Sequence, residues 1–340
     1  MDSLTQIVLG AACGEVALGK KIGNKAMLFG AIGGTIPDLD VFIGSWLYGN
    51  EIDAMSFHRG FMHSIVFAFL GAFVFGFLFF KAYDTGKRKN TTIQRDWIWL
   101  FFLSIFTHPI LDSFTPYGTQ LFLPFSDYRV ALNNISVADP AYTLPFLVCL
   151  IIAMFFNRKS NRRNWWAKAG IYISSAYMLF TIGNKIYIDS VFKKSFEKAE
   201  VAYERFSTQP TILNNILWYG IAETKDDYKV GFYSLLDSKS EIDSILTIPK
   251  NHSLIDVKHP DIKRLSWFSN QYFNLVAVDS TNRIKYNDLR YPLLNEEDAS
   301  SSVFSFELAK SGKRWDILPL YGKPPSKEDF NKFINRIYGK

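Results

Sequence analysis

Aspartate and histidine side chains occur in three short motifs whose spacing suits metal binding. The motifs PDLD, HRGFMH and THPILD contribute six candidate ligands: Asp38, Asp40, His58, His63, His108 and Asp112. His108 and Asp112 stand four residues apart, so on a helix both side chains project from the same face. Imidazole and carboxylate ligands together favour zinc, with manganese or iron as alternatives. The set is large enough for one or two ions, and two ions can clamp both oxygens of a phosphoester displacement.

Two further polar residues are candidates for catalysis beside these ligands. Arg59 lies inside HRGFMH, where its guanidinium either binds a substrate phosphate or anchors a helix end at the membrane interface. Asp139 lies in VADPAY and is expected to support the ligands or to act as a general base. The remaining histidines, His252 and His259, stand alone in the sequence, and we expect them to have structural roles.

Long apolar runs must position these motifs, because nearly all of the strongly apolar sequence precedes residue 190. A helix that crosses a bilayer needs about 20 mainly apolar residues. Candidate runs occupy 64–80, 97–114, 142–157 and 166–188, and two weaker runs rich in Gly and Ala occupy 4–18 and 26–43. Small residues allow helices to approach closely, so the weaker runs suit the interior of a bundle. The sequence therefore predicts a polytopic α-helical membrane bundle of about four to six transmembrane helices.

Basic residues are concentrated in three loops between the apolar runs. They are Lys20, Lys21 and Lys25 in the first loop, Lys81, Lys87, Arg88, Lys89 and Arg95 in the second, and Arg158, Lys159, Arg162, Arg163 and Lys168 in the third. The positive-inside rule places such loops in the cytoplasm, so all three motifs and the chain beyond residue 188 lie on the opposite side. A charge at membrane depth costs about 2.5–3.5 kcal/mol on insertion scales, and a shared cation would offset that cost.

The rest of the sequence predicts a second domain outside the membrane. We expect residues 1–189 to form the transmembrane helical domain with the His/Asp cluster, and residues 190–340 to form an extracytoplasmic α+β domain. Stretches such as ILWYGIAE and YFNLVAVD are typical of strands, and a terminal helix is expected to begin at Ser326. The net charge of +6 belongs largely to the membrane loops, so it does not indicate a nucleic-acid partner.

Five motifs together resemble the YdjM-like family of membrane-bound, predicted metal-dependent hydrolases. They are MDSLTQ, GTIPDLD, HRGFMHS, THPILDSFTPYGT and ISVADPAYTLP, which cover roughly residues 1–160. The resemblance implies a polytopic membrane protein with hydrolase activity, in which the aspartates and histidines of these motifs bind the metal. The family's opening motif usually has a histidine after the Leu-Thr pair, where this chain has Gln6. Gln6 could contribute an amide oxygen or orient a bound water in its place.

The resulting hypothesis is a metal-dependent hydrolase of the cell inner (cytoplasmic) membrane, with its site at the outer face. Membrane lipids would surround it, and a phosphoester of a lipid or lipid-linked compound would be its substrate. An ion-coupled transporter is one alternative, although the cluster is expected at one face rather than at the membrane midplane. A non-enzymatic membrane scaffold with a structural metal is the other. The sequence leaves the oligomeric state open.

Overall fold

The computed structural model describes residues 1–242, 244–278, 283–292, 302–318 and 327–339. The chain forms two compact units. The first comprises Met1–Ile43 and Phe57–Ile182, and the second comprises Gly44–Ser56 and Gly183–Lys340. The second unit therefore contains a short segment from between the motifs PDLD and HRGFMH in addition to the C-terminal part of the chain.

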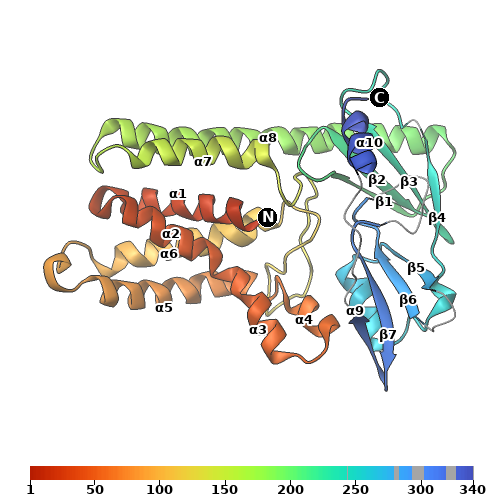
Figure 1. Cartoon of the computed structure of the whole chain (residues 1–340), viewed down its shortest axis with the longest axis horizontal. Coiled ribbons are helices and arrows are strands. Elements are labelled where there is room, and N and C mark those ends of the chain that lie inside the picture. The colour runs from red at the N-terminus through yellow and green to blue at the C-terminus, as the bar shows by residue number, and fades with distance from the viewer. Residues whose placement is uncertain (243, 279–282, 293–301, 319–326, 340) are drawn as a thin grey trace. The chain divides into compact units, whose positions relative to one another are not determined.

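The first unit is a helical bundle, in which Figure 1 shows α1, α2, α5 and α6 running side by side. Each of the six predicted apolar runs is mainly helical, although a break at Ile36 divides the run over 26–43. The helices that lie in this unit or begin in it are α1 (Ser3–Ile22), α2 (Asn24–Thr35), η1 (Pro37–Leu39), α3 (Asp40–Leu47), η2 (Phe61–His63), α5 (Ile65–Tyr83), η3 (Gly86–Arg88), α6 (Gln94–Asp112), α7 (Pro140–Met154) and α8 (Asn161–Lys198).

Glycines bring the backbones of α1 and α2 into contact. A Cβ atom at Gly10 would lie 2.4 Å from the carbonyl oxygen of Gly30, and one at Gly30 would lie 2.2 Å from that of Gly10. No side chain fits in such a space, so glycine is required at both positions. Farther along, Gly34 packs equally closely on the backbone of Gln6. The close packing predicted for these two runs is confirmed, and it brings the end of α2 against the start of α1.

One described helix, α5, is long and apolar enough to cross a membrane, and the bent pair formed by α2 and residues Pro37–Leu47 would make a second span. Much of α5 is covered by exposed apolar side chains, among them Phe69, Leu70, Phe73, Val74 and Leu78. Contact of such a surface with water is unfavourable, whereas contact with lipid chains is favourable. The N-terminal region thus has one to two apolar candidate spans. Charged residues in helices such as α1 and α6 lower the mean hydropathy of those helices.

The second unit contains two antiparallel four-stranded sheets, with strand orders β1–β2–β3–β4 and β5–β6–β7–β8. Consecutive strands pair throughout, so each sheet is a meander. The strands and helices are β1 (Arg205–Pro210), β2 (Leu217–Glu223), β3 (Asp227–Ser234), β4 (Leu246–Pro249), η4 (His252–Leu254), α9 (Pro260–Phe268), β5 (Phe273–Val278), β6 (Arg283–Asp288), β7 (Ser305–Ser311), β8 (Arg314–Leu318) and α10 (Lys327–Ile337). The predicted helix start at Ser326 lies outside the described residues.

A short helix from between the two motifs, α4 (Glu51–Phe57), packs into the second unit. Its Ile52 joins the apolar core formed by α9 and the sheet β5–β8. Its Asp53 forms ion pairs with Arg264 and, at 3.0 Å, with Arg314. The sequence did not predict this contribution, because Ile52 and Asp53 lie far from residue 190 along the chain.

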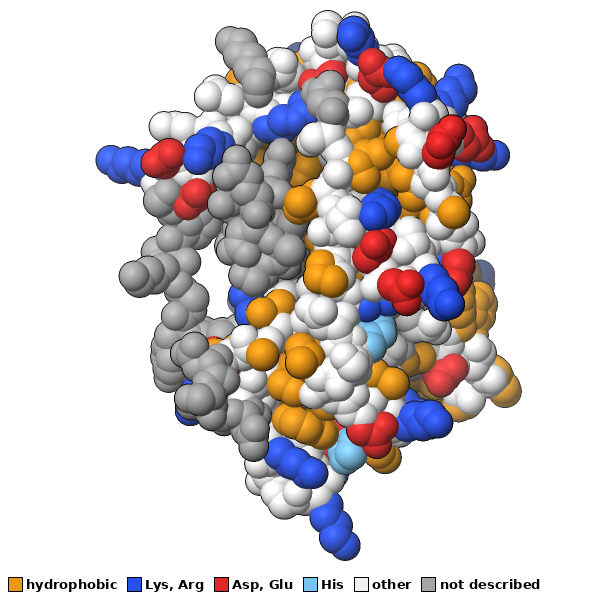
Figure 2. Space-filling view, turned by 90° about the vertical axis from the view of Figure 1, so that its right-hand side faces the viewer, with side chains coloured by type: hydrophobic (Ala, Val, Ile, Leu, Met, Phe, Trp, Pro, Cys, Tyr) orange, Lys and Arg blue, Asp and Glu red, His pale blue; other side chains and the backbone are white. Residues whose placement is uncertain are grey.

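The surface drawn in Figure 2 has acidic and basic side chains interspersed among apolar ones. This mixture contrasts with the outward face of α5, where apolar side chains predominate. A mixed surface of both charges is typical of protein in contact with water.

Candidate metal centre

Four side chains converge where α1 begins and α6 ends. They are Asp38 of η1, His63 of η2, and His108 and Asp112 of α6, and each offers one ligand atom within 4.8 Å of the others. The two histidines and Asp112 are buried, whereas the Asp38 side chain is 28% exposed. This group could hold a metal ion, and Asp38 forms its accessible edge.

Polar contacts of the outer ring nitrogens orient the two imidazoles. His108 Nδ1 donates a hydrogen bond to the carbonyl oxygen of Gly34 at 2.6 Å, and His63 Nδ1 lies 3.0 Å from Asp40 Oδ2. When Nδ1 carries the proton of a neutral ring, Nε2 presents a lone pair. The two Nε2 atoms are 3.1 Å apart, and each lies 3.4 Å from Asp38 Oδ1 and 3.5 Å from Asp112 Oδ2. Four lone-pair atoms thus face one another, and a cation among them would stabilise the group.

The spacing of these atoms fits a small divalent ion. Bonds of about 2.0–2.1 Å around tetrahedral zinc place the ligand atoms about 3.3–3.4 Å from one another. The distances of 3.1–3.5 Å given above lie on both sides of that value. Two nitrogens and two oxygens are also acceptable ligands for manganese or iron, so the donor set does not choose among the three metals.

Asp40 and His58, also predicted as ligands, lie beside the four-residue group. Asp40 Oδ1 is 2.7 Å from His58 Nδ1. Asp40 Oδ2 accepts a hydrogen bond from the backbone N–H of Arg59 and lies 3.0 Å from His63 Nδ1. Burial lowers the pKa of His58 and outweighs the opposite effect of Asp40, so burial favours the neutral ring. Asp40 therefore orients one imidazole of the group, while direct metal binding by Asp40 or His58 stays a prediction.

Local structure places the ligands at element ends. Pro37 starts η1, and its Asp38 follows directly. Ser64 caps α5 by accepting a hydrogen bond from the Phe67 N–H at 3.0 Å. His63, the last residue of η2, directly precedes this cap. Pro109 lies inside α6, which nevertheless continues for one turn to Asp112, as the spacing of the THPILD motif requires.

The guanidinium of Arg59 is buried against the group. Its Nε lies 3.0 Å from Asp112 Oδ2, its Nη1 donates to Thr115 Oγ1 at 3.0 Å, and it lies over the ring of Tyr117 at 4.5 Å. The residue has a left-handed backbone with φ of +59°, which turns the chain between α4 and η2. These contacts hold Asp112 in place, and the binding of a substrate anion by Arg59 stays a prediction.

Asp139 caps α7 with one carboxylate oxygen and accepts a hydrogen bond from a tyrosine with the other. Its Oδ1 accepts from the N–H groups of Ala141 at 3.0 Å and Tyr142 at 3.4 Å, and its Oδ2 accepts from Tyr177 Oη at 2.9 Å. Burial raises the pKa of Asp139, against the effect of these three donors. Both oxygens have structural partners, and a catalytic role for Asp139 stays a prediction.

Asp139→Ala is expected to destabilise the chain more than Asp139→Asn. Loss of an N-cap costs about 0.5–2 kcal/mol, whereas asparagine is itself a good cap. Alanine also removes the acceptor of the Tyr177 hydroxyl. Thermal unfolding of the purified chain in detergent measures the difference, and equal melting temperatures for the two variants would contradict the capping role.

Gln6, which the sequence placed near the metal, and two groups that the sequence did not assign to the centre also contact its residues. Gln6 Nε2 donates to Asp112 Oδ1 at 2.8 Å and to the carbonyl oxygen of His108 at 3.3 Å. The amino group of Met1 also pairs with Asp112. The glutamine at position 6, where the family usually has histidine, indicated a role near the candidate metal site. The carbonyl oxygen of Gly34, which accepts from His108, could not be predicted, because every residue has a backbone carbonyl.

The other two histidines have structural contacts in the second unit. His252 stacks on Phe273 with ring centroids 4.2 Å apart, and its Nε2 lies 3.1 Å from the carbonyl oxygen of Phe273. His259 caps α9, where its Nδ1 accepts a hydrogen bond from the N–H of Asp261. Both positions agree with the structural roles expected from their isolation in the sequence.

Comparison with known proteins finds relatives for the part of the chain that carries this centre. A family model described as YdjM inner membrane protein matches residues 1–186. Uncharacterized protein YfhP from Bacillus subtilis (strain 168) is 29% identical over 159 residues, 45% of this chain and 46% of YfhP. Inner membrane protein YbcI from Escherichia coli (strain K12) is 33% identical over 142 residues, 39% of this chain and 77% of YbcI. The match thus spans about half the length of YfhP. No solved structure gives a significant match.

Proposed function

Because the chain belongs to the YdjM inner membrane protein family, we propose that it is a membrane-embedded, metal-dependent hydrolase. Its substrate is a phosphoester of a lipid or lipid-linked compound at the outer face of the inner membrane. In this proposal the bundle crosses the membrane about four to six times, and the C-terminal domain is extracytoplasmic. The positive charge of the three loops supports that orientation.

The observation that carries the proposal is the set of four lone-pair atoms described above. When both rings carry their proton on Nδ1 alone, the Nε2 lone pairs of His63 and His108 and the carboxylates of Asp38 and Asp112 repel one another unless a cation lies among them. The hydrogen bond from His108 Nδ1 to Gly34 and the contact of His63 Nδ1 with Asp40 give the rings the orientation that metal-binding histidines usually have. This arrangement supports ion binding over a proton relay as the role of the group.

The residues around the ion have separate tasks in this proposal. When bound, a divalent cation supplies Lewis-acid chemistry for ester hydrolysis. Asp38, His63, His108 and Asp112 bind it, and Asp40 orients His63. Arg59 balances part of the charge of Asp112 and keeps that carboxylate directed at the centre. Gln6 donates to the other oxygen of Asp112, so both of its oxygens are positioned.

The surroundings of Asp38 support a lipid substrate. Asp38 is the partly exposed member of the group, and the apolar side chains next to it in sequence are exposed as well. Leu39 is 45% exposed and Phe42 is 73% exposed. An accessible ligand beside exposed apolar side chains suits a substrate that has one polar end and one apolar end.

The proposal is tested by hydrolysis of a total lipid extract by the purified full chain. We expect one lipid class to turn over, the turnover to stop with a chelator, and added zinc or manganese to restore it. His259→Asn, which removes a histidine far along the sequence and retains a capping residue, is the matched control for His108→Ala. If no lipid class turned over, or if turnover survived both the chelator and His108→Ala, the proposal would be wrong.

A structural metal is the second candidate, because four protein ligands complete a tetrahedral zinc site. Manganese and iron accept more ligands, so they would leave room for a substrate in the same group. Stabilisation of the chain by zinc, without turnover of any lipid with any of the three metals, would favour the structural site over the hydrolase.

A further inference from the structure

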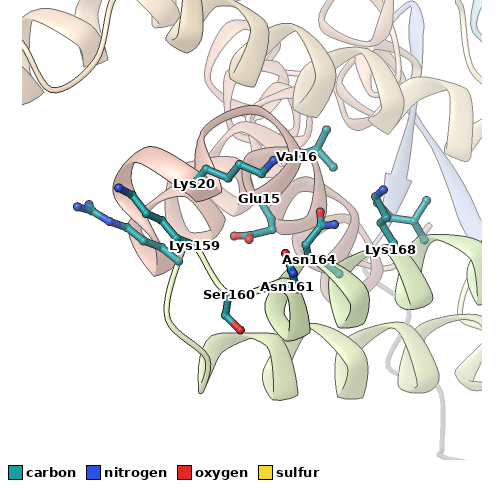
Figure 3. A pocket seen from close by; sticks show the side chains of 11 residues that line it. Glu15, Val16, Lys20, Lys159, Ser160, Asn161, Asn164 and Lys168 are labelled. Carbon is teal, nitrogen blue, oxygen red and sulfur yellow. The ribbon is translucent and has the colours of Figure 1, made fainter.

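A second charged site lies at the opposite end of α1 from the metal centre. It is a pocket of about 340 Å³ between the last turns of α1, the segment that joins α7 to α8, and the first turns of α8 (Figure 3). Four basic residues line it: Lys20, Arg158, Lys159 and Lys168. A rise of 1.5 Å per residue places Lys20 roughly 21 Å along α1 from Gln6, which contacts the metal ligand Asp112. The pocket is thus separate from the proposed hydrolase site.

The charge of the acidic lining residue, Glu15, is balanced from within the protein. Arg163 Nε and Nη2 donate to the two carboxylate oxygens of Glu15, each at 2.6 Å. Arg163 is 2% exposed, and its Nη1 also donates to Asn24 Oδ1 at 2.7 Å. Such a bidentate pair is strong and well oriented. The four basic residues of the lining therefore give the pocket a net positive charge.

In the described part of the chain, these four basic residues have no acidic partner, whereas the adjacent Lys21 has one. Lys21, one residue beyond Lys20, pairs with Asp96 at 2.5 Å. Among the residues that the structure describes, no acidic side chain forms an ion pair with Lys20, Arg158, Lys159 or Lys168. The Nη1 of Arg158 donates to the carbonyl oxygen of Lys21 at 2.5 Å, which holds its guanidinium at the edge of the pocket. Positive charge therefore gathers here without an acidic partner among the described residues, so an anionic ligand would be attracted.

The pocket also offers neutral donors and an apolar wall. Figure 3 shows the side chains of Asn161 and Asn164 between α8 and Glu15 of α1. Both lie in the first turns of α8, where the positive end of the helix dipole favours an anion. Val16 of α1 and Ile171 of α8 also line the pocket, and they contribute apolar carbon. Trp165, in the same turns of α8, is 61% exposed, as is typical of tryptophan at a membrane interface.

We propose that this pocket binds the phosphate headgroup of an anionic phospholipid, in the leaflet opposite the metal centre. The phosphate would lie among the lysines, and the glycerol and acyl carbons would continue over Val16 and Ile171. Basic pockets between membrane helices are suited to such headgroups, and the volume lies at the low end of the about 300–1,000 Å³ usual for ligand pockets. A free phosphate ion would use the same cations but would gain nothing from the apolar wall.

The test is equilibrium binding of a fluorescent phosphatidylglycerol to the full chain in neutral detergent, in the presence of a chelator. We expect Lys159→Gln with Lys168→Gln to weaken binding about 25-fold, because each cation near a lipid surface contributes about five-fold in affinity. Lys87→Gln with Lys89→Gln removes the same charge from the exposed segment after α5 and should change binding little. Replacing Lys159 and Lys168 by arginine instead should restore binding.

Competition distinguishes the source of the phosphate. Unlabelled phosphatidylglycerol should displace the probe, whereas phosphatidylcholine and inorganic phosphate at the same concentration should not. Equal weakening by the two pairs of glutamine substitutions would show attraction to net charge alone and would overturn the proposal. Displacement by inorganic phosphate as effective as that by the lipid would overturn the assignment to a lipid. Because the measurement needs neither metal nor turnover, its failure would leave the proposed hydrolase untouched.

Discussion

His63→Ala and His108→Ala are each expected to lose the bound metal while the chain still folds and inserts into the membrane. Both rings present Nε2 to the same point, 3.1 Å apart, so either substitution removes one of four ligand atoms. Residues that only support a ligand already contribute about 10–100-fold to metal affinity. We therefore expect the loss of a ligand itself to weaken binding by more than about 100-fold.

Metal analysis of the purified variants, after dialysis against a fixed concentration of zinc, measures this effect. His259→Asn is the matched control, because it removes an imidazole that caps α9 and substitutes another capping residue. Its metal content should equal that of the unchanged chain. Unchanged metal content in both His63→Ala and His108→Ala would mean that the ion, if bound, lies elsewhere.

Asp40→Asn is expected to weaken metal binding by about 10–100-fold, less than Asp38→Asn does. The Asp40 carboxylate accepts from the Arg59 N–H at 2.9 Å, and it lies 3.0 Å from His63 Nδ1 and 2.7 Å from His58 Nδ1. An asparagine retains one acceptor oxygen and places an N–H₂ donor where the other was. Where the new N–H₂ group faces His63, the ring loses the oxygen beside its Nδ1. His63 is then no longer held with Nε2 towards the centre.

The order of these two effects tests whether Asp40 orients His63 or binds metal itself. Zinc affinity of Asp38→Asn and Asp40→Asn is compared, together with the visible absorption of cobalt bound in place of zinc. If Asp40 only orients His63, Asp40→Asn should bind metal more weakly. At saturation it should keep the cobalt spectrum of the unchanged four-ligand site. Equal losses of affinity, with a changed cobalt spectrum in both variants, would instead place Asp40 among the ligands.

The local features of the first unit could be predicted from sequence because they depend on neighbouring residues. Apolar runs predict helices, and α5 and α7 occur where the runs over 64–80 and 142–157 predict them. The number of membrane crossings is harder to predict. Charged residues such as Glu15 are paired with partners far along the chain, here Arg163, and this pairing makes a charged helix compatible with burial.

The candidate ligands also divide into features that depend on neighbouring residues and features that depend on distant parts of the chain. Four of the six predicted residues converge in the structure, and for two of them, His108 and Asp112, the spacing of four residues on a helix was enough. Asp40 was predicted from its type and its closeness to Asp38. Its contact with His63 and its hydrogen bond with Arg59 depend instead on how η2 packs against η1. Metal binding itself stays a prediction for all six.

The sequence by itself determined that aspartates and histidines occur beside apolar helices in three motifs, and that these residue types are suited to binding a metal. Only the tertiary structure decided which side chains face the centre, which orient the others, and that α4 packs with the C-terminal sheets rather than with the helical bundle. The physical reason is that residue type determines which interactions a side chain can form. The choice among them depends on distances between segments that are far apart along the chain.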